Sequence, residues 1–250
     1  MEDDHATVPV VRSAHLCDGV HLSYFDVSST APSRSECVVI MHGSGNRDTK
    51  ETSLPLAKDL AACGHRVIGL DFSGSGDSSG TWSATTINGR QQQATTLLAS
   101  RLPAETPLLL IGFSLGSQTS VDLLEHFGKR IRGMALCAPA VFSTAIRDVP
   151  FGHPDILELA YGQPEEWPEA PALEALASFP GSIVLALPEH DDTVPAEMTA
   201  LIQKALQRRP QAETLVFGGA DHLLDQWLAQ HPHDRKRLLE SLLPRRGSDG

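Results

Sequence analysis

The segment PLLLIGFSLGSQTSVDLLEHF, residues 107–127, decides the fold. It begins with a continuous apolar run, which is typical of a central parallel strand covered on both faces. The run ends in GFSLG (112–116), and apolar residues then recur at helical spacing, as Leu115, Val121, Leu124 and Phe127. This strand-to-helix junction fits the nucleophile-elbow pattern G-x-S-x-G, in which a sharp turn lifts a serine oxygen above the sheet. Ser114 is therefore the candidate nucleophile.

Strands and helices also alternate along the rest of the chain. We expect strands over residues 9–16, 20–27, 37–43, 66–72, 107–113, 133–139, 182–188 and 213–217, and helices over 52–63, 85–102, 115–128, 196–208 and 224–243. Such alternation forms right-handed βαβ units. The sequence therefore predicts a single α/β domain over residues 1–250, with a doubly wound, mostly parallel sheet of about eight strands flanked by helices.

The alternation is interrupted between residues 140 and 180, where bulky apolar residues stand among prolines. We predict a small cap insertion here, over the edge of the sheet. Its aromatic residues are candidates for lining a substrate pocket, with packing of the cap onto the sheet as the alternative: Phe142, Phe151, Tyr161 and Trp167. Arg147 is a candidate for contacting a substrate carboxylate. The final residues, 244–250, are expected to be frayed.

A second stretch, GDSSG (76–80), also matches G-x-S-x-G. The strand before it ends several residues earlier, and no helical stripe follows directly, so Ser78 lacks the setting of an elbow. The surrounding GSGDSSG also approaches the dinucleotide fingerprint G-x-G-x-x-G, but the third spacing is off by one and no helix begins there. We interpret this stretch as a glycine-rich loop at the carboxyl end of a strand, beside a site.

The charge balance limits the kinds of partner. The 250 residues include 20 Lys and Arg against 31 Asp and Glu, a net charge of −11, which disfavours binding to nucleic acid or anionic membranes. The acidic N-terminus does not resemble a secretory signal, and no apolar run is long enough to span a membrane. The four cysteines include no C-x-x-C pair. We expect a cytoplasmic protein, either a monomer or a homodimer.

Four motifs follow one another along the chain: IMHGSGN (40–46), GFSLGS (112–117), EHDDTVP (189–195) and GGADH (218–222). In this order they resemble the α/β-hydrolase superfamily, and within it the compact serine esterases with a short cap, including cinnamoyl-ester hydrolase-like members. The resemblance extends from about residue 10 to residue 243. Phe113 and Ser117 depart from the nearest family pattern, which has His or Tyr before the serine and two glycines after it.

The resemblance implies a catalytic triad in the order serine, acid, histidine. The family's Asp-x-x-Val-Pro motif maps onto Asp191, with Asp192 displaced by one position as the alternative acid. His222 falls in the loop after the last strand, where the family carries its base. For the oxyanion hole the resemblance implies the backbone N–H groups of Leu115 and Ser44, with Gly43 or Gly45 as alternatives to Ser44.

These residues predict hydrolysis of a carboxylic ester or related acyl bond of a small molecule, through an acyl-enzyme. A lactonase or acyl-thioesterase is the alternative among enzymes, and a ligand sensor or non-hydrolytic member of the same fold is the alternative of another class. No cofactor is expected. No metal is expected either, because His190-Asp191-Asp192 and His231-x-His233 lack further ligands at recognisable spacing.

Overall fold

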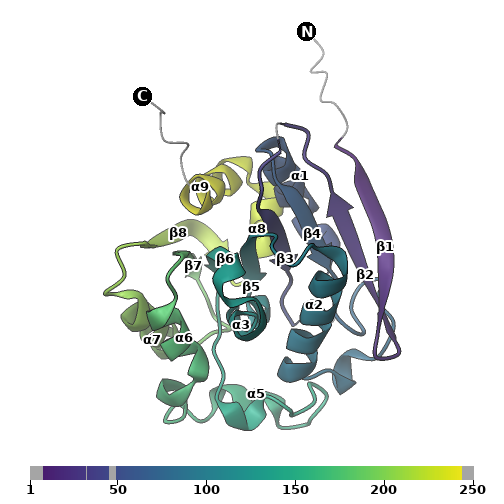
Figure 1. The fold of residues 1–250 in the computed structure, drawn as a ribbon. Helices are drawn as coiled ribbons and strands as arrows, with labels where there is room; N and C mark the ends of the chain where they lie inside the picture. Colours follow the sequence, from purple (N-terminus) through teal and green to yellow (C-terminus); the bar gives the residue numbers. More distant parts are fainter. Residues whose placement is uncertain (1–7, 32, 45–48, 244–250) are drawn as a thin grey trace.

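The computed structural model describes residues 8–31, 33–44 and 49–243 (Figure 1). Its centre is an eight-stranded sheet with the order β1-β2-β4-β3-β5-β6-β7-β8. Among the strands of the described residues, only β2 runs opposite to the direction of the others, so the predicted mostly parallel α/β sheet is confirmed. The strands are β1 (Val10–Cys17), β2 (Val20–Val27), β3 (Cys37–Met41), β4 (Arg66–Leu70), β5 (Leu108–Phe113), β6 (Ile131–Cys137), β7 (Ser182–His190) and β8 (Ala212–Asp221).

The strands at the centre of the sheet are buried on both faces. Every residue of β3 and β5 is buried, which explains their continuous apolar sequences. The two strands pair in parallel, from Cys37 opposite Leu108 to Met41 opposite Gly112. Their carboxyl ends therefore lie side by side, and the loops that follow both strands meet at one edge of the sheet.

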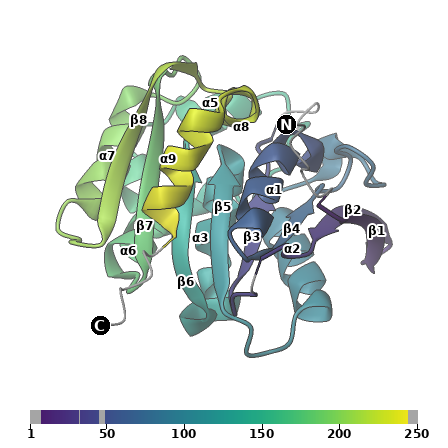
Figure 2. The same ribbon diagram turned by 90° about the horizontal axis from the view of Figure 1, so that it is seen from above.

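Helices cover both faces of the sheet (Figures 1 and 2). On one face the core includes side chains of α2, α3, α6 and α7, and on the other it includes side chains of α1, α8 and α9. The α-helices are α1 (Leu54–Ala62), α2 (Ile87–Arg101), α3 (Leu115–Asp122), α4 (Leu124–Phe127), α5 (Ile156–Tyr161), α6 (Pro171–Ser178), α7 (Ala196–Leu206), α8 (Leu224–Gln230) and α9 (Pro232–Leu242).

Two predicted helices are each divided in the structure. The helix expected over 115–128 is interrupted at Leu123, where the His126 N–H bonds to the Leu123 carbonyl three residues back, and α4 follows. The helix expected over 224–243 is divided at His231, because Pro232 has no N–H to continue α8 and instead begins α9. The strands β7 and β8 extend past their predicted ends, to His190 and Asp221.

The predicted cap, 140–180, divides into two parts. Its first part holds three short elements: η4 (Thr144–Ile146), α5 and η5 (Trp167–Glu169). Its second part, α6, contacts α3 and α7 and so belongs to the helical layer of the sheet. The residues predicted as a cap thus include both these short elements and a helix that packs against α3 and α7. The tail 244–250 lies outside the described residues.

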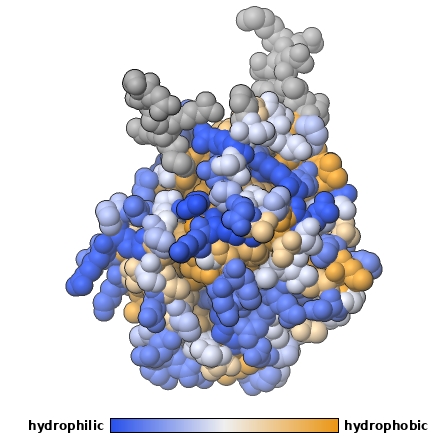
Figure 3. Space-filling view, viewed as in Figure 1, coloured by the Kyte–Doolittle hydropathy of each residue, from blue (hydrophilic) through white to orange (hydrophobic). Residues whose placement is uncertain are grey.

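The surface in the view of Figure 3 is mostly hydrophilic, with small separate apolar patches. Among the described residues, the helices are all too short or too polar to cross a membrane.

Candidate active site

The site is built around a strained turn between β5 and α3. Ser114 has φ 50° and ψ −118°, a left-handed conformation that non-glycine residues rarely adopt. Glycines on both sides make this turn possible. A Cβ at Gly112 would lie 2.3 Å from the carbonyl oxygen of Gly116, and a Cβ at Gly116 would lie 2.2 Å from that of Met41. Ser117 closes the turn, because its hydroxyl donates to the Gly112 carbonyl at 2.7 Å.

Three side chains from distant parts of the sequence form a hydrogen-bonded chain. His222 follows β8, and its Nε2 lies 3.0 Å from Ser114 Oγ. On its other side, His222 Nδ1 lies 3.0 Å from each carboxylate oxygen of Asp191, which follows β7. The side chains of His222 and Asp191 are 11% and 16% exposed. The three predicted residues thus meet at the carboxyl ends of parallel strands.

The environment of Asp191 favours its ionised form. Burial raises the pKa of a carboxyl group, but the bond to His222 and the backbone N–H groups of Val194 and Thr193 outweigh burial and lower the pKa of Asp191. Both N–H groups donate to Asp191 Oδ1, at 2.9 and 3.0 Å. The alternative acid, Asp192, is exposed and lies within hydrogen-bonding distance of the Thr193 hydroxyl, at 3.4 Å. Asp191 is therefore the carboxylate that faces the histidine.

An apolar cavity of about 100 Å³ lies beside Ser114. Its wall includes Phe142 and Phe151 from the predicted cap, together with Tyr161 from α5. Burial, aided by the nearby Asp191 charge, raises the pKa of Tyr161 to about 12, so its phenol is neutral. Trp167 is not among the lining residues. It is buried and donates from its indole to the Ala160 carbonyl at 3.3 Å, so it packs the cap, which was the alternative interpretation.

The two predicted oxyanion residues border the same cavity. Leu115 begins α3 directly after Ser114, and Ser44 lies in the loop after β3. The Ser44 carbonyl accepts a hydrogen bond from the Trp82 indole at 2.5 Å. Of the alternatives to Ser44, Gly43 lies directly beside it, whereas Gly45 lies outside the described residues.

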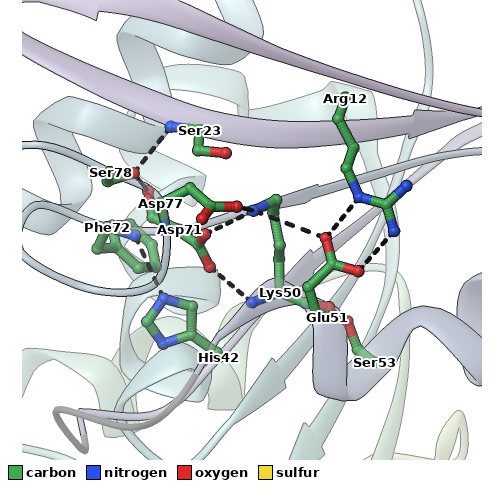
Figure 4. A network of polar contacts seen from close by, with 10 residues as sticks. All are labelled: Arg12, Ser23, His42, Lys50, Glu51, Ser53, Asp71, Phe72, Asp77 and Ser78. Atoms are coloured by element: carbon green, nitrogen blue, oxygen red, sulfur yellow. Dashed lines mark hydrogen bonds and ion pairs between the residues drawn. The ribbon is translucent and has the colours of Figure 1, made fainter.

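His42, in the same loop, is a buried neutral imidazole. Burial, together with the nearby Arg90 charge, lowers the pKa of His42 to about 3. Two hydrogen bonds indicate the tautomer that is protonated on Nδ1. The Nδ1–H donates to the Gly43 carbonyl at 2.8 Å. Nε2 accepts from the Phe72 N–H at 3.2 Å (Figure 4). His42 thus joins the backbone directly after β3 to the backbone directly after β4.

Ser78, the serine of the second G-x-S-x-G match, is held by the backbone. Its Oγ donates to the Asp71 carbonyl and accepts from the Ser23 N–H, both at 2.8 Å (Figure 4). The glycine-rich loop folds around the Asp71 carboxylate, because a Cβ at Gly76, which has φ 50°, would lie 2.2 Å from Asp71 Oδ2. The glycines therefore serve a tight turn around a buried charge.

The partner of that buried charge is Lys50, which the sequence alone did not single out. Lys50 Nζ lies 2.7 Å from Asp71 Oδ2, and both side chains are 0% exposed (Figure 4). Burial disfavours the charged ammonium, but the bonds to Asp71 and Asp77 outweigh it and raise the pKa of Lys50. The pair joins the short helix η1 (Lys50–Ser53) to the segment that follows β4.

Arg147, a candidate for contacting a substrate carboxylate, contacts side chains of the protein instead. Its guanidinium lies 2.9 Å from the Asp122 carboxylate and also donates to the side-chain oxygens of Asn88 and Gln91. Arg147 is not among the residues that line the cavity beside Ser114. Its contacts join the cap to α2 and α3.

Comparisons with known proteins agree with this fold. The family model described as the alpha/beta hydrolase fold matches residues 36–182, more than half of the chain. The thioesterase domain from the curacin biosynthetic pathway has a TM-score of 0.69 and 17% identity, and the similarity covers 93% of this chain and 99% of that one. A predicted CIB-like hydrolase from Thermoplasma acidophilum has a TM-score of 0.67 and 12% identity, covering 93% and 97%.

A third similar structure is Est1E from Butyrivibrio proteoclasticus with ferulic acid bound, with a TM-score of 0.66 and 15% identity, covering 92% of this chain and 98% of that one. Among curated proteins, no sequence matches this chain. The TM-scores show that these proteins share the fold of this chain, and at identities this low the similarity shows the fold alone.

Proposed function

The chain belongs to the α/β-hydrolase fold family, and on that premise we propose that it is a serine hydrolase of a carboxylic ester or related acyl bond of a small molecule. One observation carries the proposal. The hydrogen-bonded chain from Ser114 through His222 to Asp191 has both links at 3.0 Å and begins at a serine held in a strained turn. A nucleophile, a base and a group that orients the base are the parts that acyl transfer requires.

In the proposed first half-reaction, His222 Nε2 takes the proton of Ser114 Oγ as that oxygen attacks the substrate carbonyl carbon. The carbonyl π electrons move onto oxygen, and the N–H groups of Leu115 and Ser44 stabilise the negative charge. When the carbonyl re-forms, the bond to the leaving group breaks, and His222 gives its proton to the departing alcohol. The acyl group then remains on Ser114.

In the second half-reaction, water takes the place of the alcohol. His222 removes a proton from the water as its oxygen attacks the acyl carbon, and Ser114 leaves with that proton while the carboxylic acid is released. Asp191 supports both halves because its carboxylate holds the Nδ1–H tautomer and stabilises the imidazolium. The lowered pKa of Asp191 keeps this carboxylate ionised at neutral pH.

The cavity beside Ser114 supports a short aliphatic acyl group. The pocket is open to solvent on one side, and its volume of about 100 Å³ is smaller than that of the closed engineered cavity of about 150 Å³ that holds one benzene molecule in another protein. A cinnamoyl group contains a benzene ring and three further carbons. We therefore propose acetyl to butanoyl esters as the preferred substrates, ahead of cinnamoyl esters.

A fluorophosphonate probe, combined with p-nitrophenyl esters of increasing chain length, tests this function. We expect stoichiometric labelling of the wild-type protein, loss of labelling and turnover in Ser114→Ala, and a kcat/KM that falls beyond butanoyl. Ser78→Ala is the matched control, because it removes the serine of the other G-x-S-x-G match. If Ser114→Ala kept wild-type turnover, the proposal would be wrong.

The same experiment separates the alternatives. A sensor would be labelled or would bind ligand without turnover, since its serine completes no catalytic cycle. A lactonase or thioesterase would label equally well, but its kcat/KM for lactones or acyl thioesters would exceed that for the matched oxygen esters.

A further inference from the structure

The backbone of the loop after β3 is held by side chains at three successive carbonyl groups. Arg90 donates to the carbonyl of His42 at 2.5 Å and to that of Gly43 at 2.7 Å, and Trp82 donates to that of Ser44. The Gly43 carbonyl also accepts from His42 Nδ1. Strand pairing accounts for none of these bonds, because β3 ends at Met41. The backbone conformation of residues 42–44 therefore depends on these side chains.

Arg90 provides two of these bonds from inside the protein. It is 1% exposed and lies on the buried face of α2, which also carries Ile87 and Ala94. Its guanidinium carbon lies 3.7 Å from the centre of the ring of Phe72, two residues after the end of β4. The same Phe72 donates its N–H to His42 (Figure 4). A planar guanidinium is thus held in one orientation by a ring and two carbonyls.

The position of the Gly43 carbonyl determines the direction of the next N–H. A trans peptide is planar, so its C=O and N–H point to opposite sides. When Arg90 and His42 hold the Gly43 oxygen on the interior side, the Ser44 N–H must point to the other side. Ser44 borders the cavity that also contains Ser114.

We propose that Arg90 is a positioning residue of the oxyanion hole, a role that rests on the proposed function. By fixing the peptide between Gly43 and Ser44, Arg90 keeps the Ser44 N–H directed at the substrate oxygen as negative charge develops there. Arginine suits this role because its rigid fork donates to two carbonyls at once, whereas a lysine is a single point donor. Arg90 does not touch the substrate.

The test compares an ester with its thionoester, in which C=S replaces C=O. Sulfur is a weak hydrogen-bond acceptor, so a working oxyanion hole favours the oxygen ester. The ratio of the two kcat/KM values is independent of the amount of folded enzyme. The variants are Arg90→Ala and Arg90→Lys. Arg101→Ala, an exposed arginine on the same helix, is the control, and fluorophosphonate labelling counts the active serines.

We expect kcat per labelled serine to fall about tenfold to a hundredfold in Arg90→Ala, somewhat less than when a donor is deleted, while KM changes little. The ester-to-thionoester ratio should fall with it. Arg90→Lys should lie between Arg90→Ala and the wild type. Ethylguanidinium, well below denaturing concentrations, should restore part of the rate to Arg90→Ala and none to the control.

A merely structural role for Arg90 would reduce the number of labelled serines and leave the ratio unchanged. Wild-type kcat per labelled serine and a wild-type ratio in Arg90→Ala would therefore overturn the inference while the proposed hydrolase function stood. If Arg90→Ala does not fold, Arg90→Lys takes its place: a wild-type kcat per labelled serine and a wild-type ratio in that variant would overturn the inference. A wild-type protein that neither labels nor turns over either substrate would contradict the proposed function, and this role with it.

Discussion

A methyl group at Gly116 should separate the two segments that supply the proposed oxyanion donors. In Gly116→Ala the new Cβ would lie 2.2 Å from the Met41 carbonyl oxygen and 2.8 Å from that of His42. Both oxygens are backbone atoms at the end of β3, so no rotamer change relieves the contact. Because carbon and carbonyl oxygen approach to about 3.3 Å at closest, α3 and the end of β3 must move apart by about 1 Å.

This displacement should lower both the free energy of unfolding and the catalytic rate. Forcing extra atoms into a packed interior usually costs about 1–3 kcal/mol of unfolding free energy. Misplacing catalytic groups by about 1 Å can cost about a hundredfold in rate. Leu115 lies on α3 and Ser44 follows β3, so the two donors move relative to each other. We expect kcat/KM to fall by about a hundredfold.

The assay is kcat/KM for p-nitrophenyl butanoate, together with urea denaturation. Gly89→Ala is the matched control, because Gly89 also lies in a helix and its Cβ would meet only the Thr86 hydroxyl, at 3.2 Å. We expect this control to keep wild-type activity. Gly116→Ala with the stability and activity of the control would refute the reasoning.

Three further predictions concern charged side chains. Asp191→Asn should lower kcat about ten-thousandfold, because the amide favours the wrong tautomer of His222. The control is Asp192→Asn at the exposed neighbouring position, which should keep a kcat near that of the wild type. Similar kcat values for the two variants would contradict the assignment of Asp191. Since the pKa of Asp191 is lowered, its contribution to stability is complete above about pH 4 and is lost as the pH falls through the lowered value. Urea denaturation of wild type and Asp191→Asn should therefore converge only in strong acid, and a constant difference would argue against this linkage. Lys50→Met should lower the free energy of unfolding by about 3–5 kcal/mol, because the Asp71 carboxylate stays buried without its ammonium partner. A loss below about 1 kcal/mol in urea denaturation would contradict a stabilising role for this ion pair.

Local sequence was enough to predict the elements that have a continuous apolar run or a clear helical stripe. The segment around Ser114 is the best example, because a buried strand, a glycine-flanked serine and a helical stripe agree there. The divisions at Leu123 and His231 were missed because the stripe continues across both positions. Pro232 was a visible signal for the second division, since proline is common at the first position of a helix.

The supports of the site were harder to predict, because they depend on contacts between distant segments. Arg90 occupies a gap in the stripe of Ile87, Ala94 and Leu97, at a spacing that places it on the buried face of α2. A charged residue at such a position needs partners, which was a usable signal. Nothing local to Lys50 indicates that it meets Asp71, and nothing local to Trp167 distinguishes cap packing from pocket lining.

The spacing of the residues along the chain has a consequence for how the protein is made. Ser114 and His222 are 108 positions apart, and His222 follows β8, an edge strand that pairs only with β7. A growing chain on the ribosome therefore presents the serine long before the histidine emerges. We expect such a chain to be chemically inert until β8 docks. The appearance of probe labelling during synthesis would then time the moment at which the last strand joins the sheet.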